Sequence, residues 1–345
     1  MADTMQGLRR TCLCGEVTLE MGEVVVGGFT QRVRDKGSLI FIDLRDKSGI
    51  VQLVFDETTE KSVFEKAESV RSEYVLLAKG TVRARESVNT EIKTGGIEIV
   101  VTELRILSKA QTPPFEIVSN TKTNEELRLK YRYLDLRREP LQKNLMVRHE
   151  IAKAAREYFY ANGFTEIETP MMIKSTPEGA RDYIVPSRIH NGKFYALPQA
   201  PQIFKQLLMV SGFDKYFQIA PCFRDEDARA DRSPGEFYQL DFEMAFATQE
   251  DVFANAEEVL SAVFEKFGGK PVSPAPFKRI PYAESMLKYG TDKPDLRNPL
   301  IITELSDLFV DSDFKPFANK CVRGIRVPGM ASQSKGFFEK MEAFA

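Results

Sequence analysis

The sequence predicts an α+β protein of more than one domain, with a small β-barrel at its N-terminus. The chain has 345 residues, which is more than a single domain usually holds. Five short apolar runs separated by turn residues fill its first third, and helical patterns mixed with strands follow. With 43% hydrophobic and 28% charged residues, the chain can bury real cores and lacks the composition of a disordered protein.

The five runs are predicted strands, and a helical pattern over Thr58–Val70 lies between the third and the fourth. The strands cover Glu23–Phe29, Leu39–Asp43, Ile50–Phe55, Tyr74–Arg83 and Ile97–Leu107. Five short strands with one helix in that position are the order of an OB-fold barrel. The Pro-bearing stretch Ala110–Phe115 then predicts an inter-domain linker.

The segment after the linker is basic and helical. Lys122–Arg156 holds 10 Lys and Arg against 5 Asp and Glu. A long helix is predicted over Leu141–Ala161, ending at Asn162 and Gly163. A shorter helix, Gln202–Val210, should begin after Pro201. Its residues Gln202 and Lys205 share a face near the helix N-terminus, which favours an anionic ligand, although a solvated face fits the spacing equally well.

Two strands, Tyr216–Arg224 and Phe237–Phe246, flank a polar connection and predict an antiparallel hairpin. Alternation gives this hairpin one apolar face, the predicted core, and one polar face. The apolar face carries Phe217, Ile219, Phe223, Tyr238, Leu240, Phe242 and Met244; the polar face carries Gln218, Cys222, Arg224, Phe237, Gln239, Asp241 and Glu243. The connecting loop 224–236 holds three Arg and five Asp or Glu, which favours a functional site over a plain turn.

Charge and composition exclude several classes of protein. The formal net charge of −2 argues against coating of nucleic acid by the whole surface, but permits local basic patches. No run approaches ~18 apolar residues, so we expect no membrane span. Met1–Gly22 lacks the apolar segment of a secretory signal, so we expect a cytoplasmic protein with reduced thiols at Cys12, Cys14, Cys222 and Cys321. P-loop, Rossmann and H-E-x-x-H patterns are absent from the sequence.

Several long motifs resemble class II aminoacyl-tRNA synthetases. Residues 223–226, followed by the long loop and second strand, resemble motif 2 of that class, and 164–170 resembles the dimer-forming motif 1. Closer similarity is to bacterial aspartyl-tRNA synthetases, through RYLDLRR (132–138), STPEGARD (175–182), LPQAPQIFKQ (197–206) and YGTDKPDLR (289–297). The resemblance implies an OB-fold anticodon-binding domain (1–109), a hinge (110–140), a class II antiparallel-sheet catalytic core (141–284) and the start of a bacterial insertion domain (285–345).

The same resemblance implies an aspartate–tRNA ligase, which forms aspartyl-adenylate from L-aspartate and ATP. The aspartyl group then passes to the 3′ end of tRNA(Asp), with tRNA(Asn) open as a second acceptor. Arg224 is the implied catalytic residue, bridging carboxylate and α-phosphate. The implied aspartate-binding residues are Glu178, Gln202, Lys205, Arg224, Gln239 and Asp241. The implied ATP-binding residues are Arg224, Asp225, Glu226, Ser233 and Phe237. Mg²⁺ is an expected cofactor, with no protein metal ligands in this chain.

Anticodon contacts are implied at Arg34, Lys36, Phe41 and Gln52. Strand spacing alone would instead place Phe41 in the barrel core. Relatives that distinguish tRNA(Asp) from tRNA(Asn) often carry an apolar residue where this chain has Lys36. The choice between the two tRNAs therefore stays open. A homodimer is expected from motif 1.

The family's motif 3, with its ATP-binding arginine, has no counterpart in the sequence. We therefore expect a C-terminally truncated chain. One alternative is a tRNA-binding fragment or paralogue without ligase activity. A lesser one is an asparaginyl- or lysyl-tRNA synthetase, which Lys205 and the motif at 289–297 disfavour.

Overall fold

The computed structural model describes residues 2–176, 178–227 and 235–344. It divides into two compact units, Met1–Ala245 and Phe246–Ala345. The predicted boundaries at 109, 140 and 284 stay predictions, since the division between the units falls at Ala245 and Phe246. No helix in the described ranges is long and apolar enough to cross a membrane.

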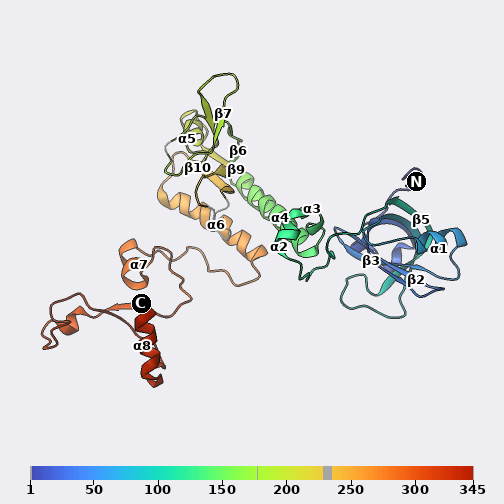
Figure 1. The fold of residues 1–345 in the computed structure, drawn as a ribbon. Helices are drawn as coiled ribbons and strands as arrows, with labels where there is room; N and C mark the ends of the chain where they lie inside the picture. Colours follow the sequence, from blue (N-terminus) through green and yellow to red (C-terminus); the bar gives the residue numbers. More distant parts are fainter. Residues whose placement is uncertain (1, 177, 228–234, 345) are drawn as a thin grey trace. The chain divides into compact units, whose positions relative to one another are not determined.

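The first unit opens with a closed barrel of five strands in the order β1-β2-β3-β5-β4, which confirms the predicted OB-fold (Figure 1). β3 pairs with β5 in parallel, and the other neighbours are antiparallel. The strands are β1 (Glu23–Asp35), β2 (Ile40–Asp46), β3 (Gly49–Phe55), β4 (Val75–Ala84) and β5 (Ile97–Ser108), with α1 (Lys61–Glu68) between β3 and β4. Two short 3₁₀ turns, η1 (Cys14–Glu16) and η2 (Leu19–Met21), precede β1.

β1 is longer than predicted and serves two neighbours. Its first half pairs with β4 up to Phe29, and its second half pairs with β2 from Phe29 to Asp35. Gly28 lies where the partner changes, and a Cβ there would stand 2.4 Å from the carbonyl oxygen of Arg45. Only glycine permits this close approach. The prediction ended at Phe29 because the second half is polar and its charged side chains lie on the outside of the barrel.

The barrel core consists of side chains that alternate with these outward residues. Ile40, Ile42 and Leu44 of β2 are fully buried, and so are Leu53 and Phe55 of β3. Burying a side chain of this size contributes roughly 1.5–3 kcal/mol, so this cluster is the main source of the barrel's stability.

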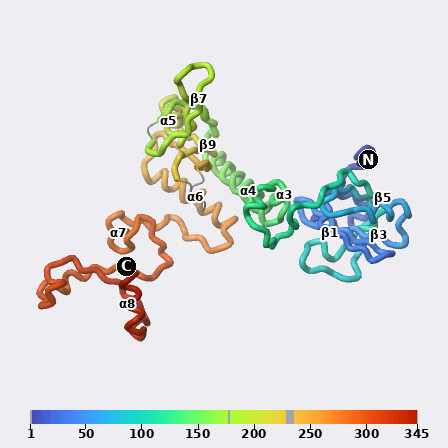
Figure 2. Tube along the Cα trace, in the orientation of Figure 1, coloured from blue at the N-terminus to red at the C-terminus, as the bar shows by residue number. Residues whose placement is uncertain are grey.

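Past the barrel, the chain runs through short helices into one long helix (Figure 2). These are α2 (Glu125–Lys130), α3 (Arg132–Asp135) and α4 (Glu139–Ala161). α4 begins two residues before the predicted start, because Pro140 is accommodated in its first turn. It ends as predicted, with Gly163 following in a left-handed conformation (φ 77°).

A buried carboxylate joins the barrel to the segment before α4. Glu73 is 4% exposed, and its two carboxylate oxygens accept hydrogen bonds of 2.9 and 3.0 Å from Nη2 of Arg45 in β2. Nη1 of Arg137 donates a third hydrogen bond to it, at 2.8 Å. The guanidinium of Arg137 also lies 3.9 Å above the ring of Phe29. The two arginines and Glu73 therefore fix β1 and β2 to the start of α4.

The rest of the first unit contains a three-stranded sheet in the order β10-β9-β6, and β9 and β10 form the predicted antiparallel hairpin. Pairing runs from Phe223 opposite Glu236 to Lys215 opposite Met244. The elements are β6 (Thr165–Glu166), the small hairpin of β7 (Ile184–Pro186) and β8 (Phe194–Ala196), α5 (Gln202–Val210), β9 (Lys215–Phe223) and β10 (Glu236–Met244).

The apolar face of this hairpin is only partly a core, which corrects the prediction. Phe159 of α4 stacks on Phe217 at 4.7 Å and packs near Phe242 at 5.4 Å. Farther along the same face, Tyr238 and Leu240 are 54% and 40% exposed. Within this unit α4 packs on only one end of the apolar face. Alternation therefore identified the two faces correctly, but it did not show how much of the apolar face is buried.

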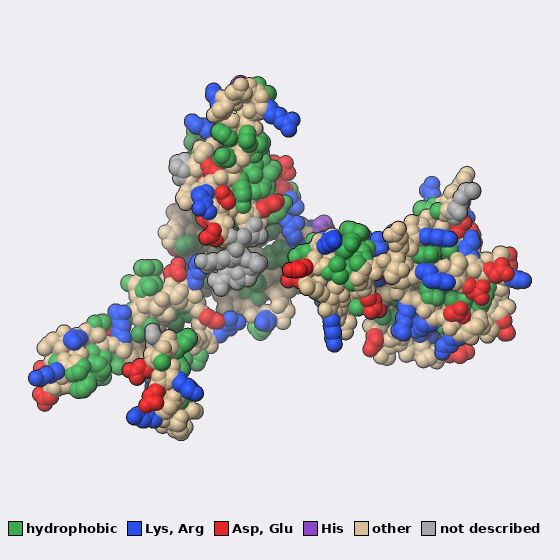
Figure 3. Space-filling model, viewed as in Figure 1, with side chains coloured by type: hydrophobic (Ala, Val, Ile, Leu, Met, Phe, Trp, Pro, Cys, Tyr) green, Lys and Arg blue, Asp and Glu red, His purple; other side chains and the backbone are tan. Residues whose placement is uncertain are grey.

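The second unit holds α6 (Gln249–Phe267), α7 (Tyr282–Tyr289), β11 (Ile302–Glu304), β12 (Arg323–Ile325) and α8 (Lys335–Phe344), with 3₁₀ turns η3 (Ser306–Phe309) and η4 (Met330–Ser332). Thr248 and Asp251 form a capping box at the start of α6. Among the described apolar residues of this unit, only Val259 and Val322 are buried. Figure 3 accordingly shows many hydrophobic side chains on its visible surface.

We predict that Glu73→Gln lowers the free energy of unfolding of the first unit by roughly 3–5 kcal/mol, because Arg45 keeps a buried charge without its counter-ion. Urea denaturation followed by circular dichroism measures this. The matched control is Glu65→Gln in an exposed pair with Lys61, which should change stability by less than ~0.5 kcal/mol. Equal stability of the two variants would contradict the role given to Glu73.

Candidate functional site

A cation with little exposed surface faces two carboxylates on the polar side of the hairpin. α5 begins after Pro201 and places Lys205 in its first turns, against β10. The ammonium Nζ of Lys205 lies 2.9 Å from Oδ1 of Asp241 and 3.2 Å from Oε2 of Glu243. Only 12% of the Lys205 side chain and 10% of the Asp241 side chain are exposed. The structure therefore brings together two residues that the sequence predicted, and adds Glu243, which alternation had placed on the same face.

The electrostatics of this cluster favour the protonated forms of Lys205 and Tyr216. Burial alone would lower the pKa of Lys205, but hydrogen bonds and charges from Asp241 and Glu243 outweigh it, so the pKa is raised. Burial, reinforced by the charge of Asp241, raises the pKa of Tyr216, so its hydroxyl stays protonated. Neither Oη of Tyr216 nor Oδ2 of Asp241 has a hydrogen-bond partner among the described residues, although both atoms are buried. Such groups suit a polar ligand.

Arg224 lies at the end of β9, on the same polar face. Its guanidinium is 4.9 Å from the centre of the Phe237 ring, and its backbone nitrogen donates to the carbonyl oxygen of Gly235 at 2.8 Å. Gly235 has a left-handed conformation (φ 81°), and a Cβ there would lie 2.8 Å from the hydroxyl of Tyr183. Burial and then the charge of Asp241 raise the pKa of the neighbouring Cys222 to about 11, against the opposing charge of Arg224.

The loop that carries Glu178 is tied to this site by a buried amide. Gln199 is 1% exposed, donates to the carbonyl oxygen of Ala180 at 2.9 Å and accepts from its backbone nitrogen at 3.1 Å. It also donates to Oδ1 of Asp182. Thr176 donates to Glu178 at 3.2 Å.

The same loop is joined to the segment after Arg224. Nε of Arg181 donates to the carbonyl oxygen of Asp225 at 2.8 Å, and the nitrogen of Asp225 donates to the carbonyl oxygen of Arg181 at 2.9 Å. Sequence reasoning did not select Gln199 or Arg181, because both act through contacts with distant segments and only the long motifs that contain them gave a signal.

The remaining predicted residues of this site differ in burial, and one of them is not described. Gln202 is one turn before Lys205 and half-buried, and Gln239 is half-buried between Phe237 and Asp241 on the polar face. Asp225 and Glu226 are exposed. Ser233 lies outside the described residues. The described part of the chain contains no group of three or more His, Cys, Asp or Glu side chains placed to hold a metal ion.

A second polar cluster lies on the outer face of the barrel. Nη2 of Arg34 donates to Oδ1 of Asp43 at 2.7 Å and to Oε1 of Gln52 at 2.9 Å. Gln52 donates in turn to Glu98 at 2.8 Å. The guanidinium of Arg34 is 5.6 Å from the centre of the Phe41 ring. Three of the four predicted anticodon residues therefore lie together.

Phe41 is half-buried on this face, and its neighbours Ile40 and Ile42 fill the core, so the alternative that placed Phe41 in the core is wrong. The fourth predicted residue, Lys36, is exposed in the turn after β1. Burial raises the pKa of Asp43 despite the charges of Arg34, Arg32 and Arg85. Asp43 and Glu98 were not selected from the sequence, because a carboxylate on a barrel strand has no distinctive local pattern.

Two family models match the chain. The model of tRNA synthetases class II (D, K and N) matches residues 124–337, and the model of the OB-fold nucleic acid binding domain matches residues 24–107. The chain therefore belongs to the class II tRNA synthetases of the D, K and N group.

Its curated relatives carry a more specific name. An aspartate–tRNA(Asp/Asn) ligase of Thermoanaerobacter sp. (strain X514) is 55% identical over 100% of this chain and 60% of that protein. One from Rickettsia bellii (strain OSU 85-389) is 54% identical over 97% of this chain and 57% of that protein. The chain thus spans about 60% of the length of the first of these relatives.

Solved structures agree on the fold. Asparaginyl-tRNA synthetase from Pyrococcus horikoshii, complexed with asparaginyl-adenylate, matches with a TM-score of 0.66 and 27% identity, over 75% of this chain and 58% of that one. The Entamoeba histolytica asparaginyl-tRNA synthetase matches with a TM-score of 0.66 over 80% of this chain and 65% of that one. Its identity of 24% supports a similarity of fold only. The predicted architecture, an OB-fold barrel followed by a class II catalytic domain, is confirmed.

We predict that iodoacetamide at pH 8 modifies Cys321 well before Cys222 or Cys14. With a pKa of about 11, roughly one Cys222 thiol in a thousand is ionised at that pH, and burial raises the pKa of Cys14 as well, whereas Cys321 is exposed. Peptide mass spectrometry gives the order of labelling. Denatured protein, in which all four cysteines should react, is the control; early labelling of Cys222 in the folded chain would show that the polar face is open.

Proposed function

We propose that this chain supplies the anticodon-binding barrel and the amino-acid-activating hairpin of an aspartate–tRNA ligase that acts on tRNA(Asp) and tRNA(Asn). The observation that carries the proposal is the largely enclosed Lys205–Asp241 pair on the same polar face of the hairpin as Arg224. Family membership and the names of the curated relatives support it.

The polar cluster complements all three charges of L-aspartate. The side-chain carboxylate needs a fixed cation, and Lys205 has three donor hydrogens, which can serve Asp241, Glu243 and a ligand together. The ammonium needs acceptors, and Oδ2 of Asp241 is buried without a described partner. Glu178, on the loop held by Gln199, is the second acceptor, and Gln202 and Gln239 border the same space.

In the first reaction, an oxygen of the α-carboxylate attacks the α-phosphorus of ATP, and pyrophosphate leaves. Two anionic groups must meet, so a cation that contacts both stabilises the transition state. Arg224 has that role, and Phe237 beneath it offers a surface for the adenine ring. Asp225, Glu226 and Ser233 would make further ATP contacts. Mg²⁺ would arrive with ATP and offset the charge of its phosphates.

In the second reaction, the 3′-hydroxyl of the terminal adenosine of the tRNA attacks the activated carbonyl carbon, and AMP leaves. Arg34 and Phe41 offer a cation and an aromatic ring on the outer face of the barrel, which is the chemistry that recognises unstacked RNA bases. Gln52, 3% exposed, lies beneath them and accepts a hydrogen bond from Arg34. Lys36 in the exposed turn beside it would contribute to acceptance of tRNA(Asn), which the relatives' names include.

We also place the protein in the cytoplasm as a homodimer formed through motif 1. Large exposed apolar side chains support a partner surface: Met171 and Met172, directly after that motif, are 46% and 48% exposed. Leu145 and Met146, near the start of α4, are 53% and 51% exposed.

Arg224→Ala should reduce aspartate-dependent exchange of pyrophosphate into ATP by roughly 100-fold or more, because the transition state loses its fixed cation. The assay is run on the 345-residue chain and on a version extended through motif 3. Arg148→Ala is the matched control, since Arg148 stacks on Tyr238 at 4.7 Å on the opposite face of the same hairpin. Intact exchange in Arg224→Ala would refute the assignment.

Phe41→Ala should leave pyrophosphate exchange unchanged and weaken tRNA binding by about 1–3 kcal/mol, the contribution of one stacked base. Filter binding of a tRNA(Asp) transcript measures the change. If Phe41→Ala bound the transcript as tightly as the unaltered chain, the barrel face would not be the anticodon site.

A further inference from the structure

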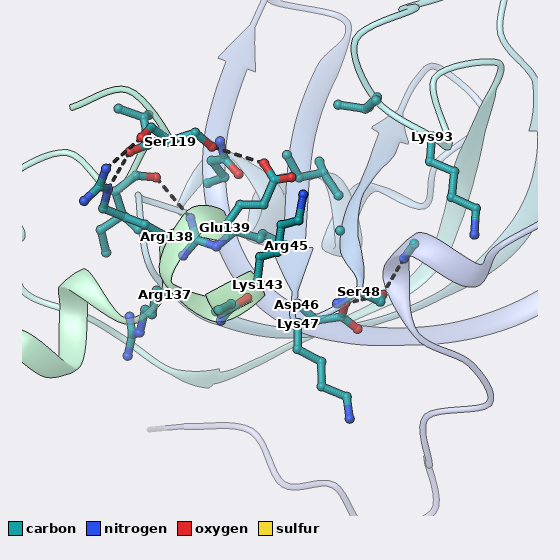
Figure 4. A pocket seen from close by; sticks show the side chains of 18 of the residues that line it. Arg45, Asp46, Lys47, Ser48, Lys93, Ser119, Arg137, Arg138, Glu139 and Lys143 are labelled. Atoms are coloured by element: carbon teal, nitrogen blue, oxygen red, sulfur yellow. Dashed lines mark hydrogen bonds between the residues drawn. The ribbon is translucent and has the colours of Figure 1, made fainter. Parts of the chain in front are cut away.

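A cavity of about 350 Å³ lies where the barrel meets the hinge, apart from the clusters around Lys205 and Arg34 (Figure 4). The turn between β2 and β3 and the loop between β4 and β5 form the barrel side of the cavity. Residues 117–119 and the first turns of α4 form the hinge side. All of these segments belong to the first unit.

The lining of this junction cavity is basic. Six Lys or Arg and three Asp or Glu side chains line it. Two of the carboxylates are already engaged: Asp46 accepts from the backbone nitrogens of Cys14 and Ser48, and Glu139 accepts from Ser119. Lys47, Lys93 and Lys143 are exposed and make no ion pair with any described residue. The positive charges of these three lysines are therefore available to an anionic ligand.

The arginines behind these lysines are rigidly held. Arg45 is fixed by Glu73, and Arg138 donates to the carbonyl oxygens of Val118 and Ser119 at 2.9 and 2.7 Å. Buried carboxylates already match both arginine charges, Glu73 that of Arg45 and Asp135 that of Arg138 at 2.9 Å, so the free positive charge of the cavity is that of the three lysines. Figure 4 shows the three lysines set apart around the cavity, so they do not converge on one small ion. Their spacing suits a polyanion that passes through.

An uncommitted amide lies in the same cavity. The pairing of β1 with β2 shifts register between Thr30 and Arg32, so Gln31 is the extra residue of a β-bulge. Bulges commonly redirect a side chain at a functional site. Gln31 lines the cavity, and its Oε1 is buried and accepts no hydrogen bond from any described group. A turn about the terminal side-chain bond would offer either an acceptor or a donor to a ligand.

The cavity also lies along the barrel strand that carries Phe41. Phe41 and Arg45 are four residues apart on β2, and therefore on the same face of that strand, about 13 Å apart. An RNA with a base stacked on Phe41 would reach the cavity within a few nucleotides.

We propose that the junction cavity binds the sugar-phosphate backbone of RNA, with Lys47, Lys93 and Lys143 on phosphates and the Gln31 amide on a ribose 2′-hydroxyl. The inference rests on the proposed function, since it assumes that the barrel binds RNA. It adds a contact that reads the ribose and the charge of the backbone, and not the identity of a base.

The charge contacts are tested by changing Lys47, Lys93 and Lys143 together to Gln. Binding of a fluorescent tRNA(Asp) transcript to the 345-residue chain is measured by anisotropy between about 50 and 200 mM salt. We expect the slope of log affinity against log salt to fall by roughly 0.7–0.9 for each phosphate that no longer meets a lysine. The matched control changes Lys61, Lys153 and Lys335, exposed lysines outside the cavity, to Gln and should keep the slope.

The ribose contact is tested with synthetic anticodon stem-loops that carry single 2′-deoxy substitutions. One such substitution should weaken binding to the unaltered chain and have no effect on Gln31→Ala, which gives a coupling energy between the two groups. An absence of such coupling at every position would remove Gln31 from the proposal.

The outcomes separate the two levels of inference. An unchanged salt slope in the triple variant, with binding still weakened by Phe41→Ala, would overturn the cavity proposal and leave the proposed function intact. No binding of RNA by the unaltered chain at the lowest salt would overturn both.

Discussion

The hydrogen bonds that Glu73 accepts from Arg45 and Arg137 determine how the barrel is mounted on the rest of the first unit. A buried carboxylate with two guanidinium partners has few alternative arrangements, because each partner would otherwise be left desolvated and unpaired. Arg137 also stacks on Phe29, the residue at which β1 passes from pairing with β4 to pairing with β2, so this strand is held by the same group. The outer barrel face around Arg34 and Phe41, the junction cavity and the start of α4 all take their positions from this group.

The second constraint is the polarity of the β9–β10 hairpin. Its polar face is the more enclosed one, with Gln218 and Cys222 buried and Lys205 held between two carboxylates. Groups that are desolvated and fixed in this way act on a charged ligand more strongly than solvated groups do, since little reorganisation is needed on binding. A core of Phe159, Phe217 and Phe242 behind one end keeps the hairpin rigid enough for that.

Local patterns in the sequence predicted the strand order, the long helix and the hairpin, because each follows from alternation, helical spacing or a terminating residue. The same patterns missed the second half of β1, because the outward side chains of Arg32 and Arg34 interrupt the apolar run by which the strand was predicted. They also overstated the core face at Tyr238 and Leu240, since alternation identifies a face but not what covers it. Glu73, Gln199 and Arg181 have no local pattern at all; their partners lie far along the chain, and only the folded structure brings them together.

The reciprocal hydrogen bonds between Arg181 and Asp225 have a thermodynamic consequence. They couple the loop that carries Glu178, the proposed acceptor for the amino acid, to the segment after Arg224, the proposed nucleotide site. A ligand that orders either segment spares the other ligand part of the entropy of ordering. By linkage, amino acid and nucleotide would then raise each other's affinity by the same factor, whichever binds first.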